Sequence, residues 1–479
     1  MEIINYNRIM KTRIEHDLLG NKEVPMDAYY GVQTLRAIEN FAGISGRHIG
    51  DFPNYVKALA MVKWAAAKAN LELDLIPKEI ANVITAACEE IIDGKLHDQF
   101  PVDMVQGGAG TSTNMNINEV VANRALELLG HQKGEYQYCH PNNHVNLSQS
   151  TNDAYPTSFH LAIILMNKDL VAELKLMVEA FRAKGREFVD VLKMGRTQLQ
   201  DAVPMTLGQE FEAFAVTLEE NIERLNDASR LFLEQNMGAT AIGTGINSEP
   251  EYSEICTREL RIISGEEFVL APNLIAATPD TGACVSYSSE LKRLAVQLSK
   301  ICNDLRLLSS GPRCGLGEIN LPPMQPGSSI MPGKVNPVIP EVVNQVCFNV
   351  VGSDTTVMMA AEAGQLQLNV MEPIIVFSLF NSIQMLTKVM ERLRVLCVNG
   401  ITANPEHCKE LVMNSIGIVT ALNPTLGYEN SSRIAKRALQ ERRSVYDLVL
   451  EEGLLTKEEL DNLLRPELMI KPKKFYKKK

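Results

Sequence analysis

The sequence lacks the features that mark membrane and secreted proteins. Its longest uninterrupted apolar run, residues 161–166, is far shorter than the roughly 20 residues of a membrane span. The first 17 residues contain no apolar signal core. The nine cysteines are odd in number and scattered, with no Cys-x-x-Cys pair, and most have apolar neighbours. We therefore expect a cytoplasmic protein without a membrane span, a disulfide framework or a zinc site.

The sequence also lacks an excess of positive charge. It has 58 acidic and 47 basic residues, a formal net charge of −11, and six of its lysines lie in residues 471–479. Nucleic acid is therefore not an expected partner. We interpret the basic C-terminus as a solvated tail without a function of its own. No cluster of Asp, Glu and His has metal-ligand spacing, so we expect no tight metal site.

Helical periodicity is the main positive signal. The chain of 479 residues is 45% hydrophobic and 22% charged, enough for about three domains' worth of buried core. Apolar residues recur at spacings of three and four along residues 291–308, 163–181, 207–225 and 375–393. A fifth helix is predicted over residues 340–351, after which residues 352–354 (Gly-Ser-Asp) indicate either a kink or a stop. Strand-type alternation is confined to residues 44–49 and 268–271.

This pattern predicts a mainly α fold built on a long central helical bundle with smaller terminal domains. The expected domains are a mixed, mostly helical N-terminal domain (1–150), the long-helix bundle (151–404) and a small C-terminal helical domain with the basic tail (405–479). Helices of about 25 to 30 residues would be about 40 Å long, which suggests a bundle shared between subunits.

Four segments between the helices are rich in Gly, Ser, Thr and Asn. They are residues 106–118 (QGGAGTSTNMNIN), 146–157 (NLSQSTNDAYPT), 195–204 (GRTQLQDAVP) and 326–337 (PGSSIMPGKVNP). One such segment would be interpreted as a capped turn, but four together favour a site that holds an oxyanion with hydroxyl, amide and backbone N–H donors. Nucleotide binding is disfavoured, because five residues separate Gly327 from Gly333 where a P-loop has four, and Val335 replaces the Ser or Thr that binds magnesium.

Residues 327–337 (GSSIMPGKVNP) resemble the signature loop of the fumarase/aspartase superfamily, and the similarity extends from residues 27–34 (DAYYGVQT) to 369–373 (NVMEP). The resemblance implies a homotetramer whose active sites combine loops of three subunits. It also implies elimination without a required cofactor, through an aci-carboxylate dianion, to give fumarate. The chain most resembles the members that release ammonia from L-aspartate, some of which a divalent cation such as Mg²⁺ can activate.

The resemblance also implies roles for individual residues. The base is Ser328, acting as an alkoxide, which requires a pKa lowered by neighbouring backbone N–H groups and by a cation such as Lys334. The carboxylate that gains charge is held by Thr111, Ser150, Thr151 and Ser329; the other carboxylate is held by Thr197, Lys334 and Asn336; Asn152 meets the amino group. Asn114 and Asn116 either cap a helix or take part in the site.

Histidine content discriminates within the superfamily. The chain has no histidine between His160 and His407, and Gln198 follows Gly-Arg-Thr where fumarases carry histidine. Glutamine can hydrogen-bond an ammonium group but cannot activate water, which favours ammonia release. A fumarate hydratase, another fumarate-releasing lyase and a non-enzymatic helical scaffold remain as alternatives. His144 is either structural or a proton relay, and we leave it out of the predicted site.

Overall fold

The computed structural model describes residues 11–470, so the basic tail lies outside the described residues. The chain divides into two compact units. Unit 1 comprises residues 1–171, 223–293 and 349–385; unit 2 comprises residues 172–222, 294–348 and 386–479. The expected domain boundaries near residues 150 and 404 stay predictions.

Five long helices run through both units. They are α5 (Thr151–Glu187), α6 (Leu207–Arg230), α9 (Gly282–Leu308), α10 (Val338–Glu362) and α11 (Glu372–Leu396). The four helices predicted from apolar periodicity are thereby confirmed. All six residues of the strongest stripe, from Leu291 to Leu308, are at most 5% exposed. The mainly α fold is therefore confirmed, because apolar stripes at helical spacing are buried along these elements.

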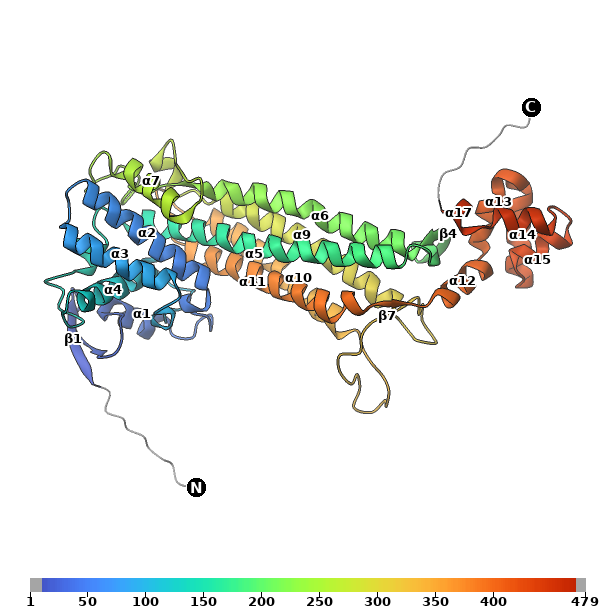
Figure 1. Ribbon diagram of the computed structural model, residues 1–479, viewed down its shortest axis with the longest axis horizontal. Coiled ribbons are helices and arrows are strands. Elements are labelled where there is room, and N and C mark those ends of the chain that lie inside the picture. Colours follow the sequence, from blue (N-terminus) through green and yellow to red (C-terminus); the bar gives the residue numbers. More distant parts are fainter. Residues whose placement is uncertain (1–10, 471–479) are drawn as a thin grey trace, which may run out of the picture. The chain divides into compact units, whose positions relative to one another are not determined.

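The rest of unit 1 is a group of shorter helices with one hairpin. The hairpin pairs β1 (Thr12–Asp17) with β2 (Gly20–Pro25) in antiparallel register. The helices are α1 (Val32–Phe41), α2 (Pro53–Glu72), α3 (Lys78–Ile92), α4 (Thr111–Leu128), α7 (Tyr252–Ser264) and α8 (Leu274–Ala277). Helix α2 contacts α3, α4 and α7, and Figure 1 shows α2, α3 and α4 close together.

The rest of unit 2 consists of two short sheets and a group of C-terminal helices. Strands β3 (Leu192–Thr197) and β4 (Gln200–Thr206) form a hairpin, and β7 (Ile319–Asn320) pairs with β8 (Thr402–Ala403). The helices are α12 (Pro405–Asn414), α13 (Val419–Leu426), α14 (Tyr428–Glu441), α15 (Val445–Glu451), α16 (Lys457–Leu463) and α17 (Pro466–Met469).

Three segments differ from what the sequence pattern indicated. Helix α10 does not end at Gly352 but continues to Glu362; one glycine costs a helix only about 1 kcal/mol, and Asp354 accepts hydrogen bonds from Ser288 and Lys292. Residues 44–49 form bends, one isolated bridge at His48 and the start of a 3-10 helix instead of a strand, with positive φ at Gly46. Residues 195–204 lie in a β-hairpin, although the sequence showed no strand-type alternation there. Of the second predicted strand, β6 (Val269–Leu270) is present and pairs with β5 (Glu234–Gln235).

Helix α11 lies within a long apolar stretch of the chain. Among the described residues, the stretch Glu372–Gly400 is long and apolar enough to cross a membrane by length and composition. However, 61% of its apolar window is buried within the protein, which is typical of a core helix.

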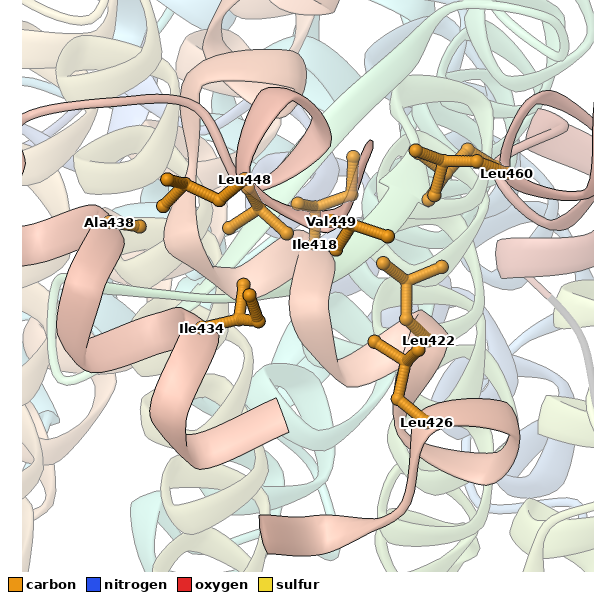
Figure 2. Packing of buried hydrophobic residues seen from close by; sticks show 10 residues of the cluster. Ile418, Leu422, Leu426, Ile434, Ala438, Leu448, Val449 and Leu460 are labelled. Atoms are coloured by element: carbon orange, nitrogen blue, oxygen red, sulfur yellow. The ribbon is translucent and has the colours of Figure 1, made fainter. Parts of the chain in front are cut away.

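A separate hydrophobic core holds the C-terminal helices of unit 2 together. It contains Ile418, Leu422, Leu426, Ile434, Ala438, Val445, Leu448, Val449, Leu460 and Leu464. Figure 2 shows side chains from several of these helices pointing toward one another. Because Leu448 and Leu422 are fully buried here, packing at this point determines whether the short helices form at all.

We predict that Leu448→Ala destabilises the C-terminal helices by about 2–5 kcal/mol, since it removes buried apolar surface and leaves a cavity. Leu439→Ala is the matched control, because Leu439 is 69% exposed on α14; it should change the free energy of unfolding by about 0.5 kcal/mol or less. Urea unfolding followed by circular dichroism and pulse proteolysis measures both. Equal losses would show that this cluster does not stabilise the C-terminal helices.

Candidate active site

The first polar segment ends in the N-terminus of α4. Thr111 is the first residue of the helix, and its Oγ1 donates a hydrogen bond to Gly108 O (2.8 Å). Gly110 precedes it with φ +86°, and a methyl group there would lie 2.4 Å from a ring carbon of Tyr155. Only glycine fits this contact, so the segment that carries Thr111 packs directly on the start of α5.

The second polar segment caps the N-terminus of α5. Ser150 Oγ accepts from Asn152 N (3.2 Å), and Asp153 Oδ1 accepts from Ser150 N (3.0 Å). Asp153 Oδ2 also accepts from the backbone N–H groups of Gly238 and Thr240. Burial raises the pKa of Asp153 to about 7. This carboxyl group therefore joins the predicted segment to residues 238–240.

Asn152 is held from two sides. Its Nδ2 donates to Ala241 O (2.7 Å), and its backbone oxygen accepts from Asn236 Nδ2 (3.1 Å). Its side-chain Oδ1 accepts no hydrogen bond within the described residues and can therefore meet an external donor. Neither Asp153 nor residues 236–241 were predicted from the sequence. The Ser-x-x-Asp spacing could have indicated Asp153, but no pattern marked residues 236–241.

A buried lysine, also missed, links the first two segments. Lys63 on α2 is 1% exposed, and its Nζ donates to Asn114 Oδ1 (2.6 Å), while Asn114 Nδ2 donates to Thr151 Oγ1 (3.2 Å). Asn116 donates to Gln99 O (2.9 Å). Both asparagines lie inside α4, so neither caps it. A lysine within the apolar run Met-Val-Lys-Trp-Ala was the available signal.

The third segment presents Thr197 and Gln198 at the tip of the β3–β4 hairpin. Thr197 pairs with Gln200, and the two residues between them, Gln198 and Leu199, have φ of +55° and +60°. Two central residues with positive φ are typical of a two-residue type I′ turn. All four tip residues are exposed. The turn thus holds two non-glycine residues in a costly conformation, which is common at functional sites.

Buried charges anchor the base of this hairpin. Glu318 is fully buried and forms two ion pairs. Its Oε1 lies 2.7 Å from Arg196 Nη1, and its Oε2 lies 3.0 Å from Lys193 Nζ. Lys193 also contacts Glu210 at 2.5 Å. Removing one partner would leave a buried charge uncompensated, so these ion pairs constrain the strand that carries Thr197.

The fourth segment lies between β7 and α10 and contains Ser328. Ser328 Oγ accepts hydrogen bonds from the backbone N–H groups of Ile330 (3.2 Å) and Met331 (3.0 Å). Two N–H donors on one hydroxyl oxygen favour its ionised form and lower its pKa. A serine that acts as a base requires such backbone N–H donors.

The same loop is closed by contacts between its ends. Gly327 N donates to Lys334 O (2.8 Å), and Asn336 Nδ2 donates to Gly327 O (2.9 Å). A methyl group at Gly327 would lie 2.6 Å from Lys334 O, so a side chain would open the loop. The side chains of Ser329 and Lys334 are exposed.

The ten predicted site residues fall into both units. Thr111, Ser150, Thr151 and Asn152 belong to unit 1, and Thr197, Gln198, Ser328, Ser329, Lys334 and Asn336 belong to unit 2. Hydrogen bonds and packing bring the first two segments together in unit 1. Within residues 11–470, no hydrogen bond joins the hairpin tip to the Ser328 loop. The assignment of these residues to substrate stays a prediction.

His144 has a structural role in the backbone. Its Nδ1 accepts from His140 N (2.8 Å), and burial lowers its pKa. This supports the structural interpretation over the proton relay. Among the described residues, no group of three or more His, Cys, Asp or Glu could hold a metal ion, and all nine cysteines are free, eight of them buried.

Comparison with known proteins identifies the family. A model described as "Lyase" matches residues 20–352, and one described as "Fumarase C C-terminus" matches residues 418–471. The chain belongs to the fumarase/aspartase superfamily.

Relatives within the superfamily match over nearly the whole chain. Aspartate ammonia-lyase of Helicobacter pylori is 59% identical over 98% of this chain and 100% of its own length, and that of Pseudomonas aeruginosa is 60% identical over 97% and 98%. A solved fumarate lyase:delta crystallin of Brucella melitensis, bound to cobalt, is 55% identical with a TM-score of 0.93 over 96% of this chain and 100% of its own. A class II fumarase of Schistosoma mansoni is 36% identical with a TM-score of 0.88 over 96% and 99%.

We predict that Gly110→Ala destabilises the protein more than Gly108→Ala, its matched control. Both glycines have φ near +86°, so each alanine should cost about 1–2 kcal/mol. A methyl group at Gly108 would have no neighbour closer than 4.0 Å, whereas one at Gly110 would overlap Tyr155 and add about 1–3 kcal/mol. Thermal unfolding measures the difference, and equal losses would refute the packing argument.

Proposed function

We propose that the chain eliminates ammonia from L-aspartate to give fumarate. The relatives named aspartate ammonia-lyase support this reaction, because they are 59–60% identical over at least 96% of the chain. The single structural observation that carries the proposal is the pair of backbone N–H groups directed at Ser328 Oγ. A serine without such donors would be too weak a base for the reaction.

In the proposed mechanism, the Ser328 alkoxide takes a proton from the carbon next to one carboxylate. The electron pair of the broken C–H bond moves into that carboxylate and forms the aci-carboxylate dianion. The pair then returns to form the carbon–carbon double bond as ammonia leaves the adjacent carbon. Lys334 supplies positive charge near the alkoxide.

The carboxylate that gains charge requires hydrogen-bond donors placed in advance. We assign Thr111, Ser150, Thr151 and Ser329 to it. The cap at the start of α5 supports this role for Ser150, because its oxygen accepts from Asn152 N and, within residues 11–470, its hydroxyl donates no hydrogen bond. Thr111 now donates to Gly108 O and would have to turn toward the ligand.

The rest of the substrate meets the remaining predicted residues. We assign Thr197, Lys334 and Asn336 to the second carboxylate. The amino group meets Asn152, whose free Oδ1 can accept from an ammonium group because its Nδ2 donates to Ala241 O. Gln198 hydrogen-bonds the amino group and, unlike histidine, does not activate water.

We further propose that the active unit is a homotetramer with sites shared between subunits. Helix α10 exposes Val342, Phe348, Val351, Met358 and Met359, and its exposed positions between Val342 and Met359 carry no charged side chain. An apolar strip of this kind is typical of an interface. Thr151 begins α5 and Thr197 follows its end, so a helix of 37 residues, about 55 Å long, connects them. These lengths favour sites completed by a second chain.

The proposed elimination moves a proton from the substrate carbon to Ser328 and an electron pair within the substrate, so it needs no electron acceptor and no required cofactor. Activation by a divalent cation such as Mg²⁺ and a cytoplasmic location stay proposals. Eight buried free thiols are consistent with a reducing compartment.

We predict that purified protein releases fumarate rapidly from L-aspartate and not from L-malate, argininosuccinate or adenylosuccinate, each offered separately. Ultraviolet absorbance measures fumarate. Malate turnover at a comparable rate would favour the fumarate hydratase alternative. If none of the four substrates released fumarate, a non-enzymatic scaffold would be favoured.

We predict that Ser328→Ala and Thr197→Val, each nearly inactive alone, complement each other when unfolded and refolded together. The loss for Ser328→Ala should be at least ~10³-fold in kcat, with binding of a substrate analogue preserved. If the two residues reach one site from different chains, roughly a quarter of the sites in a random closed oligomer contain both native residues. A re-formed mixed tetramer without recovered activity would refute the shared site and leave the reaction untouched.

A further inference from the structure

Lys63 occupies an unusual environment in unit 1. Its Nζ donates to Asn114 Oδ1 (2.6 Å), Gln149 Oε1 (2.8 Å) and Asn146 Oδ1 (3.2 Å), so its hydrogen-bond partners are amide oxygens from α4 and the segment before α5. No ion pair to Lys63 is formed within residues 11–470. Burial lowers its pKa to about 7. Burying an amino group without an ion-pair partner is unfavourable, so a lysine at this position indicates a functional role.

Lys63 determines the direction of the neighbouring hydrogen bonds. Its nitrogen donates in both protonation states, since a neutral amine retains two N–H groups, and the shortest contact is to Asn114. Asn114 must therefore turn its oxygen to Lys63 and its Nδ2 away. That Nδ2 donates to Asn146 Oδ1 (3.1 Å) and to Thr151 Oγ1 (3.2 Å).

Thr151 is the last member of this chain of hydrogen bonds. Its hydroxyl has one hydrogen to donate, and Oγ1 already accepts from Asn114 Nδ2. Within the described residues, Thr151 Oγ1 donates no hydrogen bond. If Asn114 were reversed, its oxygen would take the Thr151 hydrogen, and the hydroxyl would present a lone pair to any bound anion.

We propose that Lys63 is a positioning residue for the elimination: through Asn114, it makes the Thr151 hydroxyl a donor to the carboxylate that gains charge. This inference rests on the proposed function of Thr151. No proton is transferred along the chain. The fixed N–H and O–H dipoles point from Lys63 toward the developing negative charge, which stabilises the transition state more than the bound substrate.

A purely structural role for Lys63 is the competing explanation, and Asn70 offers a matched control. Asn70 lies on α2 two turns after Lys63 and is fully buried. Its Nδ2 donates to Leu147 O (3.0 Å), and its Oδ1 accepts from Ser148 Oγ (2.8 Å). It therefore supports the same segment, but within the described residues it makes no hydrogen bond to Lys63, Asn114 or Thr151.

The test is a double-mutant cycle on fumarate release from L-aspartate. We expect Lys63→Met to lower kcat by roughly 10²-fold, as for the loss of one oxyanion donor, with KM changed less than about threefold. Thr151→Val removes the directed hydroxyl. When Lys63→Met is added to Thr151→Val, kcat should fall by less than about threefold further. Asn70→Leu should retain at least half of wild-type kcat. It should lower kcat by the same factor in the wild-type and Thr151→Val backgrounds.

Asn114→Leu is carried through the same cycle in case Lys63→Met does not fold, because it removes the middle link and keeps a side chain of similar size. Its penalty should likewise largely disappear in the Thr151→Val background. The inference would be overturned if Lys63→Met and Asn114→Leu lowered kcat by the same factor in the Thr151→Val background as in the wild type. A wild-type protein that does not release fumarate from aspartate would instead refute the proposed function, so the two failures are distinguishable.

Discussion

Backbone N–H groups directed at side-chain oxygens are the interaction on which the candidate site depends. Two such groups point at Ser328 Oγ, and three point at the carboxylate of Asp153. These donors cannot change rotamer or lose a proton, so they favour negative charge without reorganising when it appears. The segment that directs two of them at Asp153 has positive φ at Gly238 and Thr240.

Backbone strain is accordingly concentrated near this site. Among the described residues, ten non-glycine residues have positive φ. Five of them lie beside or contact the predicted site: Ala109, Ser148, Gln198, Leu199 and Thr240. Each conformation costs of order 1–3 kcal/mol and persists only where its surroundings over-determine it. The long buried helices, together with contacts such as Asp153 to Thr240, supply that constraint.

Periodicity predicted the long helices correctly because an apolar stripe is a local property of a sequence. It left a kink and a stop open at Gly352, and the stop is excluded because contacts of Asp354 with α9 stabilise the helix beyond the glycine. It failed at residues 195–204, where the hairpin turn contains no glycine at its two positive-φ positions. Gly-rich signals for type I′ turns are absent there, and the buried Glu318 stabilises the strand from a distant part of the chain.

The sequence by itself determined the long-helix architecture, the family and the Ser328 loop, because these depend on apolar spacing and on a contiguous run of residues. The tertiary structure decided the importance of Lys63, Asp153 and residues 236–241. The partners of Lys63 lie 51 to 86 positions away in the chain, and Asp153 meets N–H groups 85 and 87 positions away. A hydrogen bond between residues so far apart leaves no local pattern, since it exists only after packing has brought the segments together.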